Sequence, residues 1–381
     1  MASVTIPHLE RFEAVCADPY AGARAHAEQG GKVAGFMCSY APQELFHAAG
    51  YLPVRIIGRE GGTERSDRLL QPFACSFARS AFDCALGGDF DFLSLAVFSH
   101  TCDTMQNLAD LWKAHTPDAP VLIVSVPTQV AGAAALEYFR SELHRVKSEL
   151  EAIAGPIPEG RLRDSVRLYL AHQQRMRDLY ALRRAHPGLM TGSQMMAVVM
   201  SSFLMPKEEH HQLLSEVLDA LRPVEDGSRI ERPRVLVGGS VCQSRAFIDA
   251  IESAGCTVAD DDLCMGSRSF LLPDIDESDP IDAILQSYAQ RTPCPAFHKP
   301  GFHPGGHIVE RARAAQADGV VYLLTKFCDP AGFDYPPERK ALEDAGIPVL
   351  MLEVEQHLPV PQQLTTRVEA FAEMLETRAG A

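Results

Sequence analysis

The stretch LSLAVFSHTCD, residues 93–103, is a short apolar segment that ends in polar residues and a cysteine. Its length and its content of Val and Phe favour a buried β-strand within residues 91–100. The stretch VVYLLTKFCD, residues 320–329, has the same order of apolar segment, cysteine and aspartate. Open parallel sheets hold ligands at the carboxyl ends of their strands. Cys102 and Cys328 are therefore the first candidates for a functional site.

Short apolar strands alternate with helix-like segments around both stretches. The first unit is expected to run as strand 32–38, helix 41–50, strand 51–58, helix 79–86, strand 91–100, helix 105–115 and strand 120–127. The second is expected to run as strand 233–240, helix 245–255, strand 256–262, strand 320–326, helix 336–346 and strand 347–355. This alternation predicts an α/β protein with two doubly wound parallel sheets, each flavodoxin- or Rossmann-like.

A third region separates the two units. Residues 134–221 carry apolar side chains at three- and four-residue spacing and lack strand signals, which indicates a helical layer or bridge. Pro223, Asp226, Gly227 and Ser228 are typical of a linker. The predicted organisation is N-terminal helices at 1–30, a first α/β domain at 31–133, a helical region at 134–225 and a second α/β domain at 226–381.

Composition excludes several classes of function. A chain of 381 residues that is 46% hydrophobic can bury a large core in two or three domains. Its net charge of -15, without a Lys/Arg cluster, argues against binding to nucleic acid or to anionic membranes. There is no apolar run of membrane-spanning length, and the N-terminal sequence does not resemble a signal peptide, so a cytoplasmic location is expected.

The ten cysteines divide into two groups. In a reducing compartment disulfides are not expected, so cysteines in loops indicate thiol reactivity or metal binding. Cys16, Cys84, Cys242 and Cys256 lie inside helix or strand patterns and are interpreted as core side chains. The loop cysteines are Cys38, Cys75, Cys102, Cys264, Cys294 and Cys328. Their spacing is too wide for zinc knuckles and suits an iron–sulfur cluster assembled by tertiary structure, with small buried thiols as the alternative.

Five segments resemble the 2-hydroxyacyl-CoA dehydratase and benzoyl-CoA reductase subunit family. The resemblance covers roughly residues 30–130 and 232–375 and is weak in the helical middle. The segments are GFMCSYAPQELFHAAGYLPVRI (35–56), CSFARS (75–80), SHTCDTMQNL (99–108), DDLCMGSRSF (261–270) and TKFCDP (325–330).

The resemblance implies an electron-transfer catalyst whose iron–sulfur cluster lies between two domains. Family members hold a [4Fe-4S] cluster on three cysteines, which match Cys75, Cys102 and Cys328 here, and one iron stays open to water or a substrate carbonyl. They receive low-potential electrons from a separate ATP-hydrolysing iron–sulfur activator. Consistently, the chain has no GxxxxGK[ST] sequence for binding nucleotide phosphates. The partner is expected to be an identical chain or a paralogue.

A branch of the family binds a double-cubane [8Fe-9S] cluster on six thiolates. This alternative would use all six loop cysteines, adding Cys38, Cys264 and Cys294 to the first three. Cysteines like Cys38 and Cys264 also occur in members with the single cluster, so the count of six leaves both clusters open.

Four polar residues near these cysteines are further candidates. Glu44 is interpreted either as a proton donor or base, or as a solvated first-turn glutamate favoured by the helix dipole. His100 could deliver a proton or hydrogen-bond a sulfur, or could be a polar neighbour at a strand end. Arg79 and Arg268 could offset a cluster's charge or bind a CoA phosphate, with surface solvation as the alternative.

One histidine-rich stretch is ambiguous. FHKPGFHPGGHIVE, residues 297–310, holds His298, His303 and His307 and suggests either a metal site or a surface loop rich in Pro and Gly.

Three functions follow as hypotheses. The first is activator-dependent reduction or radical dehydration of a CoA thioester. The second is a stand-alone double-cubane reductase of small molecules. The third is a non-redox binding module whose cysteines are inert, and the brown colour of an anaerobic iron–sulfur preparation would exclude it.

Overall fold

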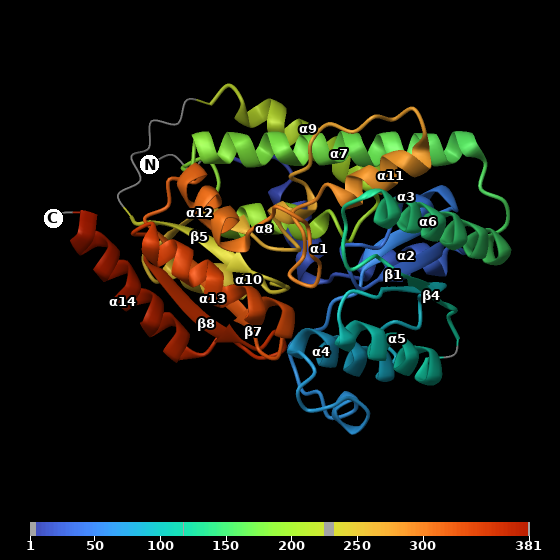
Figure 1. Cartoon of the computed structure of the whole chain (residues 1–381), viewed down its shortest axis with the longest axis horizontal. Helices are drawn as coiled ribbons and strands as arrows, with labels where there is room; N and C mark the ends of the chain where they lie inside the picture. Colours follow the sequence, from blue (N-terminus) through green and yellow to red (C-terminus); the bar gives the residue numbers. More distant parts are fainter. Residues whose placement is uncertain (1–4, 117, 225–231, 380–381) are drawn as a thin grey trace.

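Two four-stranded parallel sheets form the framework of the protein (Figure 1). The computed structural model describes residues 5–116, 118–224 and 232–379. The first sheet has the order β2-β1-β3-β4 and the second the order β6-β5-β7-β8. Their strands are β1 Lys32–Phe36, β2 Tyr51–Arg55, β3 Leu95–Ser99, β4 Val121–Val124, β5 Arg234–Gly239, β6 Thr257–Asp262, β7 Gly319–Thr325 and β8 Val349–Val354. All pairings are parallel, which confirms the predicted fold class.

The helices that connect these strands fall into three groups. The first unit contains α1 Leu9–Ala17, α2 Ala21–Glu28, α3 Gln43–Ala48, α4 Ser76–Leu86 and α5 Asp103–His115. The middle region contains α6 Ala133–Ala154, α7 Glu159–Ala185, α8 Gly192–Ser201 and α9 Lys207–Leu221, in agreement with its apolar spacing. The second unit contains α10 Arg245–Ser253, α11 Pro280–Ala289, α12 Pro304–Ala314, α13 Asp329–Asp344 and α14 Gln362–Ala379. Short 3₁₀ turns occur at Ser66–Arg68 and Ser267–Ser269.

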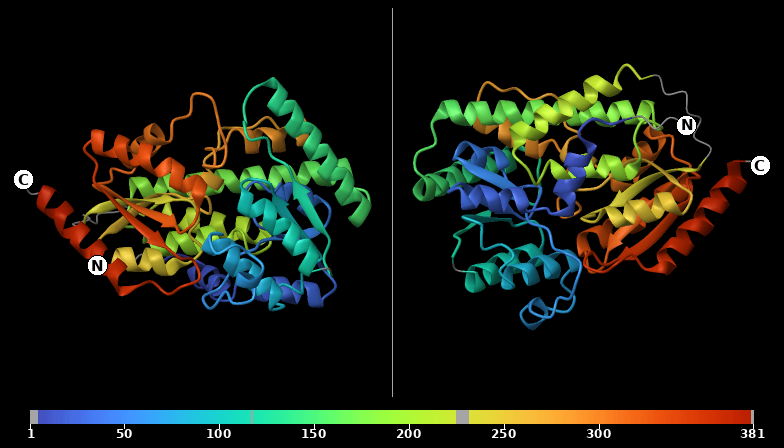
Figure 2. Two further views of the ribbon diagram at one scale, coloured as in Figure 1. Left: turned by 60° about the horizontal axis from the view of Figure 1, so that its bottom comes forward. Right: turned by 180° about the vertical axis from the view of Figure 1, so that it is seen from behind.

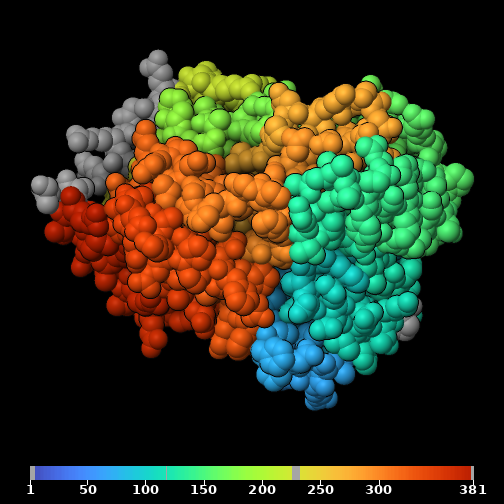
Figure 3. All heavy atoms as spheres, viewed as in Figure 1, coloured from blue at the N-terminus to red at the C-terminus, as the bar shows by residue number. Residues whose placement is uncertain are grey.

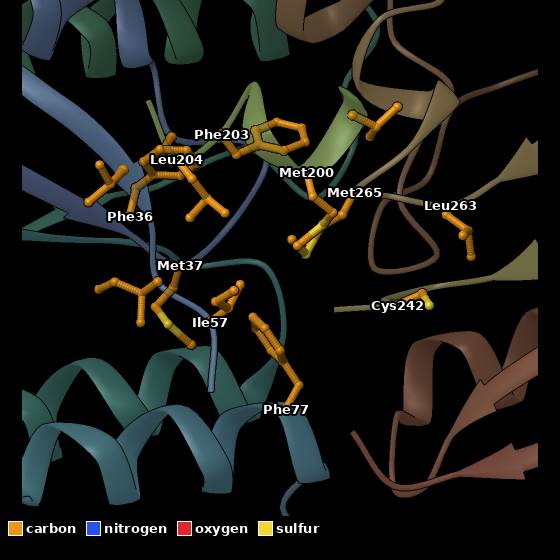
Figure 4. Close-up of a cluster of buried hydrophobic side chains, with 14 of the residues drawn as sticks. Phe36, Met37, Ile57, Phe77, Met200, Phe203, Leu204, Cys242, Leu263 and Met265 are labelled. Atoms are coloured by element: carbon orange, nitrogen blue, oxygen red, sulfur yellow. The ribbon is translucent and has the colours of Figure 1, made fainter. Parts of the chain in front are cut away.

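The middle helices join the two units into one body. Helix α7 runs along the long axis of the molecule, past both sheets (Figures 1 and 2). One continuous set of buried apolar side chains includes residues of both units and of α8. In Figure 4 this core brings together Met37 and Ile57 from the first unit, Met200, Phe203 and Leu204 from the middle, and Leu263 and Met265 from the second.

Buried aspartates strengthen the attachment of α7 to the second unit. Asp260 in β6 has no exposed surface and pairs with Arg184 of α7 at 3.1 Å and with Arg311 of α12 at 2.9 Å. A buried carboxylate is stable only when it is paired and hydrogen-bonded. Asp260 therefore depends on both arginines to compensate its charge. Asp260 thus links β6 to α7 and to α12.

The structure differs from the sequence-based prediction at two places. Helices α11 and α12 lie between β6 and β7, where the predicted order has no helix. The histidine-rich stretch is not a surface loop along its whole length, because α12 begins at Pro304 with His303 as its N-cap. Proline is favoured in the first helical turn, where its missing N–H has no partner to lose. The linker expected at Pro223–Ser228 lies mostly outside the described residues.

None of the helices within the described ranges has both the length and the apolar character needed to cross a membrane.

Candidate functional site

Three of the loop cysteines stand at the first residue before a helix. Cys75, Cys102 and Cys328 are the N-caps of α4, α5 and α13. The backbone N–H groups at the start of each helix point toward the N-cap side chain. Those of Phe77 and Ala78 act on the Cys75 sulfur and partly offset the burial that raises its pKa. The backbone N–H groups of Thr104 and Met105 act on the Cys102 sulfur in the same way. Helices α4 and α5 therefore direct N–H donors at their N-cap sulfur atoms, which is an arrangement that stabilises thiolate.

The carboxyl ends of the two sheets bring the cysteines together. Cys38 follows β1 and its Sγ lies 3.8 Å from the Thr101 hydroxyl at the end of the neighbouring strand β3. In the second sheet, the Ser240 hydroxyl after β5 donates to Cys328 Sγ after β7 at 3.4 Å. Each contact lies where the strand order reverses, which is the usual binding crevice of a doubly wound sheet.

All six loop cysteines belong to one electrostatic group. Burial raises the pKa of Cys75 to about 12, and Cys328 and Cys102 contribute to the rise. Burial likewise raises the pKa of Cys102 to about 11, with added effects of Cys38 and Cys328. The pKa values of Cys264 and Cys294 are raised first by burial and also by neighbouring thiols, Cys38 among them. The six half-buried thiols, three from each unit, are therefore close enough to influence one another.

Hydrogen bonds across the units hold these cysteine loops together. Ser39 is the central residue, because its hydroxyl donates to the Cys264 carbonyl oxygen at 3.1 Å. The backbone N–H of Cys294 donates to the Tyr40 hydroxyl at 3.4 Å. Thus the loop after β1 in the first unit is bonded to two cysteine segments of the second.

Three buried guanidinium groups surround the Cys38, Cys264 and Cys294 side of this group. Arg55 is 2% exposed, Arg291 is 5% exposed and Arg268 is 8% exposed. Arg268 forms a close pair with Asp262 at 2.7 Å, and its charge acts to lower the pKa of both Cys264 and Cys294 against the effect of burial. Within the described part of the chain, Arg55 and Arg291 have no carboxylate at ion-pair distance, and the Nε atom of each is buried without a partner.

These residues fit an anionic iron–sulfur group better than a single metal ion. Among the described residues, no set of three His, Cys, Asp or Glu side chains is close enough to hold one ion. A cluster spreads its thiolates over several irons, so its ligands lie farther apart than those of a single ion. Soft thiols supply the donors, and the unpaired guanidiniums supply positive charge for a negatively charged group.

Glu44 is buried beside the same loop and is not solvated. It is 2% exposed, and burial raises the pKa of its carboxyl. The Tyr288 hydroxyl lies 2.7 Å from the Ala41 carbonyl oxygen and 3.1 Å from Glu44 Oε2. A phenol has one hydrogen to donate, and the carbonyl is its closer acceptor. A protonated Glu44 that donates to Tyr288 satisfies all three groups, in agreement with the raised pKa.

The remaining candidates have other partners. Burial acts to raise the pKa of the Glu142 carboxyl, but hydrogen bonds from Arg145 and the Ser125 N–H lower it, and His100 lies near enough to add a smaller effect. Arg79 is mostly buried and pairs with Asp67 at 3.1 Å and with Glu355 at 3.5 Å. The surface alternative is therefore wrong for Arg79, as it is for Arg268. With two carboxylates Arg79 is already compensated, which leaves it no free charge for a phosphate.

The three histidines of the ambiguous stretch do not come together. His303 caps α12, and His307 Nε2 lies 3.0 Å from Asp262 Oδ1. His298 is bonded through its backbone N–H and carbonyl to Thr128 and Val130, in the loop after β4. Each histidine therefore has its own structural contact, and the stretch as a whole does not form a metal site.

Of the four cysteines interpreted as core side chains, three are buried, and Cys16 is half-buried. Cys84, Cys242 and Cys256 are at most 4% exposed, and Cys16 Sγ lies 3.6 Å from the Ala197 carbonyl oxygen.

Sequence reasoning missed Arg55, Arg291 and Tyr288. Two signals were present in the chain. Arg55 is the only charged residue in the apolar run YLPVRII, and Arg291 precedes Cys294 by three residues. A charge inside an otherwise apolar strand is rare unless it meets a partner, and it marks a position worth testing.

Known proteins resemble the chain over almost its whole length. A model of the family described as 2-hydroxyglutaryl-CoA dehydratase, D-component, matches residues 38–375. The (R)-phenyllactyl-CoA dehydratase beta subunit of Clostridium sporogenes is 29% identical over 96% of this chain and 97% of its own length. The lactoyl-CoA dehydratase subunit beta of Anaerotignum propionicum is 30% identical over 96% and 98%.

A benzoyl-CoA reductase subunit of Thauera aromatica is 27% identical over 92% of both chains. The residues that the family model matches include all six loop cysteines and most of both sheets. These comparisons confirm the resemblance stated from the sequence segments. The chain belongs to the 2-hydroxyglutaryl-CoA dehydratase D-component family of dehydratase and reductase subunits.

Proposed function

We propose that this protein is an iron–sulfur subunit that reduces or dehydrates a CoA thioester. The observation that carries the proposal is the meeting of six half-buried thiols from two sheets beside buried guanidiniums that lack a carboxylate. The names of its relatives, which are dehydratase beta subunits and a reductase subunit, support the same substrate class.

Cys75, Cys102 and Cys328 would hold a [4Fe-4S] cluster between the two units. When bound, the cluster supplies single electrons at low potential. The N–H groups at the starts of α4 and α5 favour the thiolate form of Cys75 and Cys102.

Glu44 holds a proton inside the same site. Burial raises the pKa of its carboxyl, which favours the neutral form, and the carboxyl is oriented by Tyr288, which in turn is fixed by the Ala41 carbonyl and by the Gln43 N–H. A neutral carboxyl in an apolar site can donate a proton without first taking one from water. Glu44 is thus the residue of this chain best suited to protonate a leaving hydroxyl or a reduced acyl group.

The second proton-carrier hypothesis, His100, has less support. It acts on Glu142, which lies in α6. Within the described residues the structure gives His100 no partner among the thiols. Glu44 is therefore the first residue to test for proton transfer.

Iron and labile sulfide measured in anaerobically reconstituted protein test the proposal. We expect both to be retained, and to be mostly lost in Cys102→Ser and Cys328→Ser, because a hydroxyl is a poor iron ligand. Cys256→Ser is the control, since Cys256 is a buried core side chain. Protein that retains neither iron nor sulfide after reconstitution contradicts the proposal.

The double-cubane [8Fe-9S] cluster is the second candidate, and with it a stand-alone reductase of small molecules. It is favoured by the position of Cys38, which interacts with Cys102, and of Cys264, which interacts with Cys328. Cys294 in turn interacts with Cys38 and Cys264. About eight irons per chain would support it. About four irons, unchanged by Cys264→Ser and Cys294→Ser, would support the single cluster.

Two partners complete the proposed enzyme. One is an ATP-hydrolysing iron–sulfur activator, since no GxxxxGK[ST] sequence is present in this chain. The other is a second subunit, a paralogue or an identical chain, because the relatives are named as subunits of larger enzymes.

A further inference from the structure

Two buried arginines from different units converge on one serine. Arg55, at the end of β2, donates from Nη1 to the Ser39 hydroxyl at 3.0 Å. Arg291, just after α11, donates from Nη1 to the Ser39 carbonyl oxygen at 2.5 Å. Two like charges that approach the same residue repel each other, and burial removes the water that would screen them.

Neither arginine has a carboxylate that compensates its burial within the described part of the chain. The Nε atoms of Arg55 and Arg291 are buried without a hydrogen-bond partner. Besides the neutral oxygens of Ser39, aromatic rings lie beside them. The Arg55 guanidinium lies 5.7 Å from the Phe36 ring centre and 5.9 Å from that of Phe77, and the Arg291 guanidinium lies 3.9 Å from that of Tyr288. Aromatic rings attract a cation only weakly compared with a carboxylate. The charge of the two guanidiniums is thus largely uncompensated by the chain itself.

Their position points to what compensates them. Ser39 follows Cys38 directly and is bonded to the Cys264 backbone. Arg55 also acts to lower the pKa of Cys264, so its charge reaches the thiols. Arg291 acts in the same direction on Glu44, whose pKa is nevertheless raised by burial.

We propose that Arg55 and Arg291 are the counter-charges of the thiolate-bound cluster and that they raise its reduction potential. This inference rests on the proposed function. A cluster that takes up one electron gains one negative charge, and a fixed positive charge nearby favours that reduced state. The two arginines therefore lessen the driving force that an electron donor must supply.

The test measures the midpoint potential of the reconstituted protein in an EPR-monitored redox titration. Arg55→Met and Arg291→Met are expected to shift the reduction equilibrium about tenfold toward the oxidised state, which is about 59 mV for a one-electron couple. Arg55→Lys and Arg291→Lys keep the charge and should restore most of the potential, although they cannot reproduce the hydrogen bonds to Ser39. Loss of iron in a Met variant with retention in its Lys variant also supports the proposal. Potentials that are unchanged in the Met variants overturn it.

A control and a second measurement separate this inference from the proposed function. Arg183 is also buried, but its guanidinium donates to three backbone carbonyls outside the cysteine loops, so Arg183→Met should cost stability without moving the potential. In metal-free protein, Arg55→Met should unfold at the same or a higher temperature, because an uncompensated buried charge is replaced by an apolar side chain. A lower unfolding temperature contradicts the counter-charge role, whereas absence of iron from the unaltered protein contradicts the proposed function instead.

Discussion

Glu44 shows how one buried carboxyl can be tested at the scale of a single residue. Glu44→Gln keeps the shape of the side chain and its contact with Tyr288 but removes the transferable proton. We expect turnover of a CoA thioester to fall about 100-fold or more, because that is the usual contribution of a positioned proton donor. The iron content should not change, since Glu44 is not a ligand in the proposed site. Full turnover in Glu44→Gln would remove Glu44 from the mechanism.

Glu338 on α13 is a second buried carboxyl with a measurable consequence. It is 1% exposed, and burial raises its pKa to about 8. Between pH of about 4.5 and about 8 the folded protein therefore holds a proton that the unfolded chain releases, and stability falls as pH rises. Glu338→Gln has no carboxyl to ionise at this position. The free energy of unfolding of the variant, relative to that of the parent, should therefore increase by up to about 1.4 kcal/mol for each unit by which the pH rises.

Urea unfolding of metal-free protein at several pH values measures this difference. Glu343→Gln is the matched control on the same helix, because Glu343 is exposed and pairs with Arg339 at the surface. Parallel pH profiles for the parent and Glu338→Gln would show that Glu338 is ionised in the folded protein.

At the scale of the element, α11 positions Tyr288 near its end and Arg291 just beyond it. Its N-cap Asp279 accepts a hydrogen bond from the Asp282 N–H at 2.9 Å, and Pro280 occupies its first turn. Asp279→Ala should lower the free energy of unfolding by about 1 kcal/mol, whereas Asp279→Asn should keep it, because Asn caps a helix equally well. Thermal unfolding compares the two variants, and equal losses would mean that the cap is not what Asp279 contributes.

Elements whose signals are local could be predicted from the sequence. Strands β3 and β7 are short apolar runs followed by a cysteine, and both lie where this pattern indicates. Helix α12 was missed because Pro and Gly in HPGGHIVE are typical of loops, although proline after a capping side chain starts a helix equally well. The burial of Arg55 and Arg291 depends on packing between segments far apart in the sequence, such as the Arg291 contact with Ser39, and no local pattern carries that information.

At the scale of the whole molecule, the two units meet beside an exposed segment that precedes α4 (Figure 3). This segment ends at Cys75 and includes Phe73, which is 65% exposed. The thiols are only partly exposed. An electron donor would therefore have to dock on the protein surface near them, such as on this segment.

Turnover is therefore expected to require a separate electron donor. Anaerobic reactions with acyl-CoA substrates should depend on an activator ATPase, on ATP and on a strong reductant, and should vary with the ratio of the two proteins. Omitting ATP alone is the control, because it leaves every protein in place. Equal turnover without the activator and ATP would show that the cluster is reduced by a simpler route.

The cysteines that begin α4, α5 and α13 occupy positions where serine is among the best residues for starting a helix. Each of these helices thus gives up part of its own stability for a sulfur atom. In a gene copy whose protein no longer binds iron, Cys-to-Ser changes at 75, 102 and 328 would be favoured for two reasons. They remove a reactive thiol, and they place a better N-cap residue at the start of a helix. Relatives that have lost their redox role should therefore be recognisable by serine at these three positions while they keep the same fold.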